Sequence, residues 1–215
     1  MALPDSPLAG YLSGNRRLYA QLRPDPESLT QLTGLQRDLA VLPEVNDGGR
    51  PRWVPERQMH LTLIHFGKVR DVYAVVSVAT GIGREDYEKL LVDYVAETEA
   101  AMPRRPVVLE PAVLSRFGRQ GRTLVLEYFP SAVLMQAHAA ALAALEVFLR
   151  RCGIADVAAF TAADPNFMFA SRLRPHITLS HAFAGTLPAL FHGSGPGADA
   201  FHLASIRLES MPVVH

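Results

Sequence analysis

The sequence predicts a mixed α and β fold built from two similar lobes that face each other. The hexapeptides HLTLIH and HITLSH, which begin at His60 and His176, read as near-copies, and both look like strands. The elements around them also recur in the same order, because a strand and a helix precede each histidine strand. An internal duplication within a single domain, residues 1–215, accounts for both observations.

The first half of the chain carries the first set of these elements. Residues 17–22 (RLYAQL) read as a short strand, and leucines at helical spacing predict a helix over residues 24–42. Pro43 ends that helix, and the turn-rich residues 44–51 lead to the first histidine strand, which ends near Gly67.

The second half carries the second set. Residues 106–118 and 122–129 look like two strands joined by a turn that contains glycine. Ser131 can cap a long helix that Gly153 stops. The second histidine strand follows, and residues 201–210 predict a last strand.

The segment between the halves is harder to interpret. Its first part, VYAVVSVATGIG, is compatible with a buried strand or a short helix, whereas residues 84–101 predict an amphipathic helix. Residues 69–102 are interpreted as an insertion of unknown purpose.

Composition describes an ordinary soluble protein without a strong overall charge. The chain has 215 residues, of which 49% are hydrophobic, and its 21 basic and 21 acidic side chains cancel. No overall field therefore attracts a long nucleic-acid backbone, and any nucleic acid is expected to be met as an end or a short piece. The single cysteine, Cys152, excludes an internal disulfide and a cysteine-only zinc site.

A cytoplasmic location is expected, without a membrane partner. The opening MALPDSPLAG lacks the basic start and apolar run of a secretory signal. No stretch is expected to approach the roughly 20 apolar residues that span a bilayer. No obligate protein partner is evident, although the Ala-rich helix that follows Ser131 could form a partner surface instead of packing on its own sheet.

The repeated motif carries groups suited to phosphodiester chemistry. Side chains alternate along a strand, so His60 shares a face with Thr62, and His176 shares a face with Thr178. If the two faces converge on one cleft, a neutral imidazole can take a proton from the attacking oxygen while a protonated one donates to the departing oxygen. The hydroxyls can donate to the non-bridging phosphate oxygens, and no metal or other cofactor is needed.

Other site types fit the sequence less well. No histidine pair has the His-Glu-x-x-His spacing of a zinc site, and a Gly-x-Ser-x-Gly nucleophile motif is absent. GIGRED, at residues 81–86, is too short for a dinucleotide fingerprint. Alternation also places His65 and His181 on the faces opposite His60 and His176, unless a bulge intervenes.

Together these motifs resemble those of the two-histidine (2H) phosphoesterases, the group of LigT-like RNA 2′,3′-cyclic phosphodiesterases and 2′-5′ RNA ligases. The resemblance covers most of the chain, and RLYAQLRPDPESLTQLTGLQ, RWVPERQMHLTLIHFG and LRPHITLSHAF carry it. It implies a bilobal α+β fold with antiparallel sheets, outer helices and a central groove. It also implies metal-independent chemistry, with His60 as general acid, His176 as general base, and Thr62 and Thr178 as phosphate-binding hydroxyls.

The resemblance has two departures. The two motifs are further apart than in compact members, which places the extra length in residues 69–102. In addition, His65 and His181 stand where an aromatic residue and an arginine are expected. The second departure leaves open which substrate the protein takes.

Several other residues are candidates for holding a nucleotide. Arginine matches phosphate geometry, so we consider Arg116, Arg119 and Arg174, each of which could equally be a solvated loop residue. Three aromatic residues could stack on a base or could belong to the core, namely Trp53, Phe117 and Phe167.

The sequence therefore predicts an enzyme that hydrolyses 2′,3′-cyclic phosphates of RNA ends or nucleotides, with 2′-5′ RNA ligation or cleavage as related chemistry. One alternative is a two-histidine phosphodiesterase for a small nucleotide. The other is a module that binds an RNA end or nucleotide without turnover. The direction of the reaction and the oligomeric state are left open.

Overall fold

The chain forms two four-stranded antiparallel sheets, and each sheet contains one of the two histidine strands. The computed structural model describes residues 16–167, 170–187 and 205–211. One sheet has the order β3-β1-β8-β4, and the other has the order β2-β7-β6-β5. The strands are β1 (Arg17–Pro24), β2 (Arg52–Trp53), β3 (Leu61–Lys68), β4 (Val107–Leu109), β5 (Pro111–Phe117), β6 (Thr123–Tyr128), β7 (His176–His181) and β8 (Ile206–Ser210).

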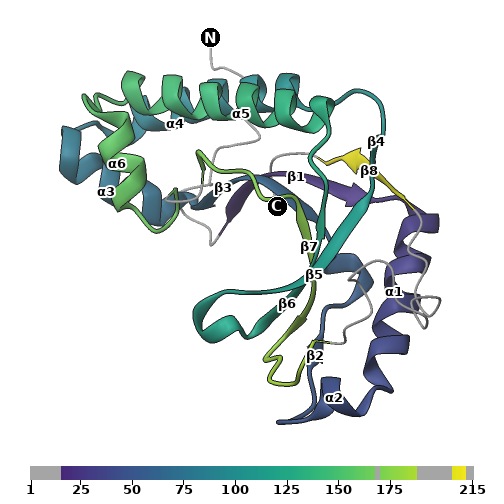
Figure 1. The fold of residues 1–215 in the computed structure, drawn as a ribbon. Coiled ribbons are helices and arrows are strands. Elements are labelled where there is room, and N and C mark those ends of the chain that lie inside the picture. Colours follow the sequence, from purple (N-terminus) through teal and green to yellow (C-terminus); the bar gives the residue numbers. More distant parts are fainter. Residues whose placement is uncertain (1–15, 168–169, 188–204, 212–215) are drawn as a thin grey trace.

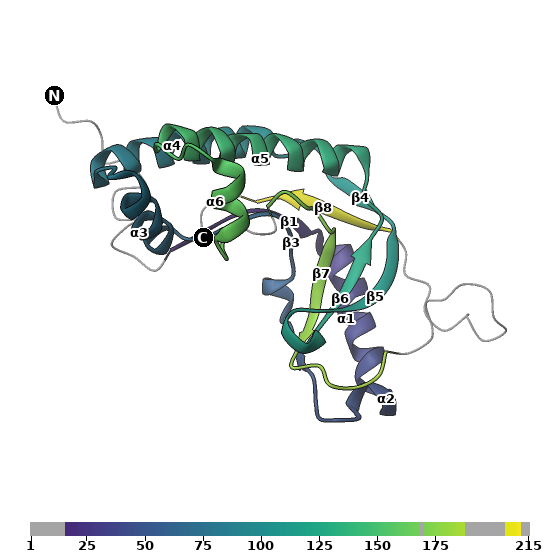
Figure 2. The ribbon, with the colours of Figure 1, turned by 60° about the vertical axis from the view of Figure 1, so that its left-hand side comes forward.

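Helices cover the outer sides of both sheets. The described helices are α1 (Pro26–Ala40), α2 (Pro43–Asn46), α3 (Val69–Thr80), α4 (Arg84–Ala101), α5 (Ala132–Arg151) and α6 (Val157–Ala163). Helices α4 and α5 run side by side over the sheet that contains β1 and β3, while α1 contacts β1 and β8 of this sheet and donates through Gln36 to Leu179 of β7 in the other (Figures 1 and 2). The fold class is thus the α+β class that was predicted, with antiparallel sheets and helices outside.

Helices α1 and α5 each begin at a capping residue, and the cap at Ser131 is the one that was predicted. The Asp25 carboxylate accepts a hydrogen bond from the Ser28 amide at 2.8 Å, and α1 ends at Ala40, two residues before the predicted end. The Ser131 hydroxyl accepts from the Leu134 amide at 3.2 Å at the start of α5. These caps satisfy backbone N–H groups that have no partner within their helices.

The ambiguous segment after Gly67 is helical. Residues 69–80 form α3, which ends at Gly81 in the left-handed conformation (φ 73°). Helix α4 has the predicted bounds, and its apolar side is buried against α5. The interpretation of this segment as an insertion stays a prediction.

The prediction of one strand over residues 106–118 is wrong. The chain leaves β4 in one sheet and enters β5 in the other, with exposed Glu110 between the two strands. The Glu110 carbonyl accepts from the Phe129 amide at 3.0 Å, and Pro111, which has no N–H to donate, opens β5. An apolar run without a turn signal conceals this change of sheet. Of the predicted last strand, β8 begins at Ile206, Ser205 lies just before it, and residues 201–204 lie outside the described part.

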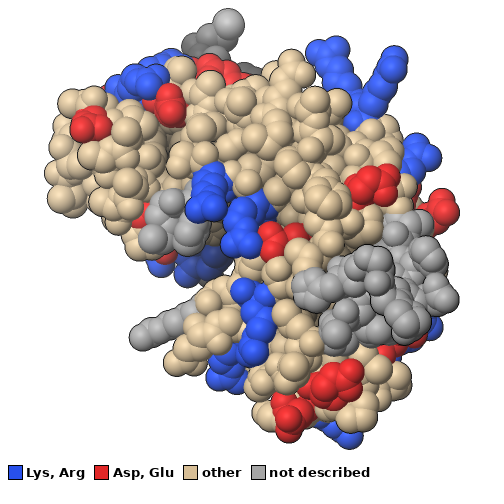
Figure 3. Space-filling view, viewed as in Figure 1, with Lys and Arg blue, Asp and Glu red and all other residues tan. Residues whose placement is uncertain are grey.

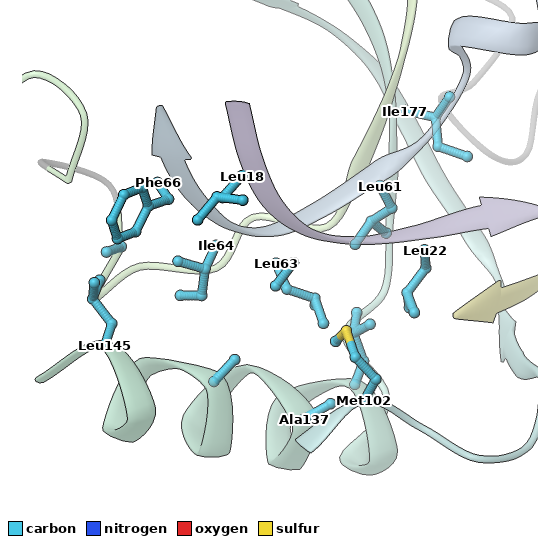
Figure 4. Packing of buried hydrophobic residues seen from close by; sticks show 14 of the residues in the cluster. Leu18, Leu22, Leu61, Leu63, Ile64, Phe66, Met102, Ala137, Leu145 and Ile177 are labelled. Atoms are coloured by element: carbon cyan, nitrogen blue, oxygen red, sulfur yellow. The ribbon is translucent and has the colours of Figure 1, made fainter. Parts of the chain in front are cut away.

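The expectation that no stretch is long and apolar enough to span a membrane is also wrong. Helix α5 has 20 residues, with a mean hydropathy of 1.7 over its most apolar window. This helix contacts α4 and β3, and Leu134, Leu145 and Phe148 on it are buried in the main core. One side of α5 packs on the core, with Ala137 and Leu145 facing the strands, and this contact explains why the helix carries so many apolar residues (Figure 4).

Candidate active site

The first histidine strand contains an irregularity directly after its His-x-Thr. In the pairing of β1 with β3, Gln21 lies opposite Thr62, but the next residue, Ala20, lies opposite Ile64. Leu63 is therefore an extra residue, which is the definition of a β-bulge. Leu63 and Ile64 are both buried, whereas Thr62 is half-buried.

This bulge changes the face on which His65 lies. After the extra residue, His65 pairs with Tyr19, which is two positions from Gln21 on a regular stretch of β1. Alternation along β1 places Tyr19 on the face of Gln21, and His65 consequently lies on the face of Thr62. The Tyr19 ring contacts both histidines, with centroids 6.2 Å from His60 and 4.9 Å from His65. The prediction that His65 lies on the face opposite His60 is therefore wrong, because a bulge intervenes, which was the stated exception to simple alternation.

The second histidine strand carries the same irregularity at the same motif position. Leu124 of β6 pairs with Ser180 and the next residue, Val125, pairs with Thr178, so Leu179 is the extra residue. Leu63 and Leu179 are each the fourth residue of a His-x-Thr-Leu motif. The repeat in the sequence is therefore also a repeat of backbone geometry.

The two motif histidines are oriented by equivalent hydrogen bonds. His60 Nδ1 lies 2.7 Å from the Gln58 carbonyl oxygen, and His176 Nδ1 lies 2.7 Å from the Arg174 carbonyl oxygen. A carbonyl can only accept a hydrogen bond, so in both rings Nδ1 carries the proton. When either ring is neutral, its lone pair is then on Nε2, which is the atom that can accept a further proton.

His176 has surroundings that favour the neutral ring. Burial, chiefly, lowers its pKa below the usual value, and the neighbouring Arg174 charge adds a small lowering. The hydrogen bond to the Arg174 carbonyl and the negative charge of Glu127 act in the opposite direction. A neutral His176 suits a proton acceptor at neutral pH.

An aromatic ring and an ion pair lie beside His176 and shape its environment. The Phe117 ring lies 4.6 Å from the His176 ring, measured between centroids, and the Arg174 guanidinium lies over the same phenyl ring at 4.1 Å. Arg174 also donates to both Glu127 carboxylate oxygens at 2.9 Å. Arg174 therefore contacts His176 through its carbonyl, while its side chain packs on the Phe117 ring that lies against His176.

His65 is fixed by a loop that sequence reasoning did not connect to the site. Its Nδ1 lies 3.1 Å from the Asn166 carbonyl oxygen. The Asp164 carboxylate accepts from the Asn166 amide at 2.7 Å and from the Asn166 side chain at 2.9 Å. This loop approaches β3 so closely that a Cβ on Gly67 would collide with the Asn166 side chain. No sequence signal links Asn166 to a residue about 100 positions earlier.

The other candidate residues have different positions. The Arg116 guanidinium donates to the Gly121 carbonyl at 2.9 Å and lies over the Phe183 ring, and Arg116 is on the face of β5 opposite Phe117. The side chain of Arg119 lies outside the described part. Phe167 is buried in the core against Phe66, so it offers no face to a base.

Trp53 and His181 lie on the paired strands β2 and β7. Trp53 is half-buried on β2 and pairs with Ser180. His181 is exposed at the end of β7. Among residues 16–167, 170–187 and 205–211, no group of three or more His, Cys, Asp or Glu is placed to hold a metal ion.

The two histidine strands approach each other within the core. Some Cα atoms of β3 and β7 are within 8 Å of each other. Leu61 and Ile177, which directly follow the two motif histidines, belong to the same buried cluster (Figure 4). The surface is hollowed between the upper and lower parts of the molecule, and Lys and Arg side chains gather on both sides of this hollow (Figure 3).

Comparison with known proteins gives fold similarities only. No protein-family model matches the chain, and no curated protein matches it. Among solved structures, it is similar to TT0787 of Thermus thermophilus (18% identity, 80% of this chain and 77% of that chain, TM-score 0.49). It is also similar to a protein described as a phosphoesterase (20%, 80% and 78%, TM-score 0.46) and to E. coli LigT complexed with 3′-AMP (18%, 81% and 78%, TM-score 0.46).

Proposed function

We propose that this protein is a metal-independent phosphoesterase that hydrolyses 2′,3′-cyclic phosphates of RNA ends or nucleotides. The observation that carries the proposal is the repeated geometry of the two motifs. Each has a histidine whose Nδ1 donates to the carbonyl two residues earlier and a threonine on the same face, followed by a bulged leucine. Two imidazoles that are oriented by the same hydrogen bond suit an acid and a base that act on one phosphate.

In the proposed reaction, His176 acts first. Its Nε2 accepts a proton from the attacking water as the water oxygen bonds to phosphorus. The bond from phosphorus to one ribose oxygen breaks, and that oxygen takes a proton from Nε2 of protonated His60. The product is a phosphate monoester, and one proton has moved from His60 to product while His176 has gained one, so exchange with solvent restores the resting state. Thr62 and Thr178 donate hydrogen bonds to the non-bridging oxygens, where negative charge increases in the transition state.

The assignment of acid and base follows the resemblance and agrees with the lowered pKa of His176. If a 5′-hydroxyl replaces water as the nucleophile, the same ring opening forms a 2′-5′ diester as the bond from phosphorus to the 3′ oxygen breaks, which is ligation, and in the reverse cleavage the two histidines exchange roles. The hollow bordered by Lys and Arg is compatible with an anionic substrate (Figure 3). A cytoplasmic location and a single domain over the whole chain stay predictions.

The test is turnover in the presence of EDTA of 2′,3′-cyclic AMP and of a short RNA that ends in a 2′,3′-cyclic phosphate. His60→Ala and His176→Ala should each lower kcat/KM by at least about 10²-fold, because each removes a proton-transfer group. Both variants should unfold at nearly the wild-type temperature, since neither ring lies in the buried core.

Three other outcomes would change the proposal. Near-normal turnover in either folded variant would contradict the two-histidine mechanism, and activity lost to EDTA would favour a metal enzyme. Binding of both compounds without product would favour the non-catalytic module. Weakening of the RNA reaction by salt, without a matching effect on the mononucleotide, would favour RNA over a small nucleotide.

A further inference from the structure

A row of polar side chains extends along β3 beyond Thr62. The β1–β3 pairing contains a second bulge, because Leu18 lies opposite Gly67 whereas the next residue, Tyr19, lies opposite His65. The extra residue is Phe66, which is fully buried. The two bulges at positions 63 and 66 replace the usual spacing of two residues by a spacing of three.

This spacing puts Thr62, His65 and Lys68 on one face of the sheet. Their partners on β1 are Gln21, Tyr19 and Arg17, which alternate regularly and therefore share that face. The Arg17 guanidinium donates to the Tyr19 hydroxyl at 3.2 Å, so the Arg17 side chain is directed along this row.

The far end of the row is positively charged. Arg17 is exposed and Lys68 is half-buried, and they lie directly opposite each other at the end of the β1–β3 pair. Within the described part of the chain, neither forms an ion pair with a carboxylate, whereas Lys89 on α4, the other lysine of the protein, pairs with Glu85 at 2.9 Å. The two positive charges are therefore available to an anion.

The row is longer than the separation of two phosphates on one nucleoside, so a second phosphate would be held by the cationic side chains that reach back along it, as Arg17 does toward Tyr19. Tyr19 lies about 7 Å beyond Gln21 along β1, and Arg17 lies about 7 Å further, at roughly 3.4 Å per residue. Thr62 is at one end, where the proposed reaction places the cyclic phosphate. The Tyr19 and His65 rings stand in the middle, and long cationic side chains at the other end can reach back toward them.

We propose that Arg17 and Lys68 form a second phosphate subsite, which binds the 5′-phosphate of the nucleoside whose cyclic phosphate is bound at Thr62. The subsite rests on the proposed function for the identity of the first phosphate. Its ligand is either a mononucleotide with a free 5′-phosphate or the last nucleotide of an RNA, in which the same phosphate is a diester.

The subsite is tested by a binding measurement that needs no turnover. Calorimetry compares adenosine 2′-phosphate with adenosine 2′,5′-bisphosphate on the wild type, Lys68→Met, Arg17→Gln and the control Lys89→Met. One charge-assisted contact corresponds to about a tenfold gain in affinity, so the wild type should prefer the bisphosphate by about that factor. Lys68→Met and Arg17→Gln should each reduce the preference to about twofold or less, and Lys89→Met should keep it.

A wild type without preference for the bisphosphate, or without binding of either compound, would overturn the subsite. The same holds if neither Lys68→Met nor Arg17→Gln reduces the preference. These results are separate from the fate of the proposed function, which depends on turnover of cyclic substrates.

The source of the second phosphate is resolved by kinetics. The substrates are 2′,3′-cyclic AMP, its 5′-phosphorylated form, and a dinucleotide with a 2′,3′-cyclic end. If the 5′-phosphorylated form has the higher kcat/KM, the subsite binds a free nucleotide; if the dinucleotide has the higher value, it binds an RNA end. If both values equal that of 2′,3′-cyclic AMP, the subsite does not contribute to turnover.

Discussion

Replacement of Gln36 by leucine tests how α1 supports the second histidine strand. The Gln36 side-chain amide donates to the Val54 carbonyl at 2.9 Å and to the Leu179 carbonyl at 2.8 Å, and Gln36 is buried. Leu179 is the bulged residue that follows Thr178. The leucine side chain has a similar size but cannot donate, so the substitution removes both hydrogen bonds.

The cost follows from the partners that remain. The Leu179 carbonyl keeps the Val54 amide as a donor at 2.9 Å, whereas the Val54 carbonyl loses the Gln36 donor. Two lost hydrogen bonds cost about 1 kcal/mol each, and a buried acceptor without a partner costs about 1 kcal/mol more. We expect Gln36→Leu to lower the free energy of unfolding by about 3 kcal/mol. At about 2–4 °C per kcal/mol for a chain of this size, Tm should fall by roughly 6–12 °C.

Thermal unfolding with Gln31→Leu as the control measures this effect. Gln31 lies on the same helix, and its buried Oε1 has no hydrogen-bond partner among the described residues. Removing that oxygen should leave Tm unchanged or slightly higher. If Gln36→Leu unfolded within 1–2 °C of the wild type (about 0.5 kcal/mol), or if both variants lost the same stability, the proposed support of the bulge would be wrong.

Two further substitutions test the surroundings of the site. Phe117→Ala should raise the pKa of His176 toward its usual value, because burial is the main cause of its lowering. Since the base works when neutral, the rate falls as pH falls through this pKa, and the acid limb of the pH–rate profile should move to higher pH; an unmoved limb would argue against His176 as base. Gly67→Ala should cost about 1–2 kcal/mol in backbone strain at φ 88° and more through collision with Asn166. Denaturant unfolding beside Gly81→Ala, where φ is 73° and no atom lies within 4 Å of the added Cβ, isolates the collision, and equal losses would contradict it.

Periodicity and the repeated motif were sufficient for much of the fold. The leucine spacing predicted α1, and the capping residue Ser131 marked the start of α5, because an N-cap is a local interaction between residues three apart. The change of sheet at Glu110 was missed, because nothing local distinguishes one long strand from two strands in different sheets. The same limit applies to α5, whose apolar sequence alone is compatible with a core helix or a membrane helix.

In the candidate site too, local periodicity was predicted correctly and features that depend on a partner strand were missed. Alternation correctly placed His60 beside Thr62 and His176 beside Thr178, since it needs only the period of a strand. It failed at His65, because a bulge depends on the register with the partner strand and leaves no mark in the sequence. The Gln58 and Arg174 carbonyls that orient the rings are backbone atoms, so the residue types at these positions do not predict the contacts.

The central claim is that His60 and His176 act together on one cyclic phosphate. The most direct measurement is kcat/KM for 2′,3′-cyclic AMP, with EDTA, on the wild type, His60→Ala, His176→Ala and the double variant. Because the two groups act in one step, the double variant should be about as slow as the slower single variant. Losses that multiply in the double variant would mean that the histidines act independently, and a folded single variant with near-normal turnover would contradict the account.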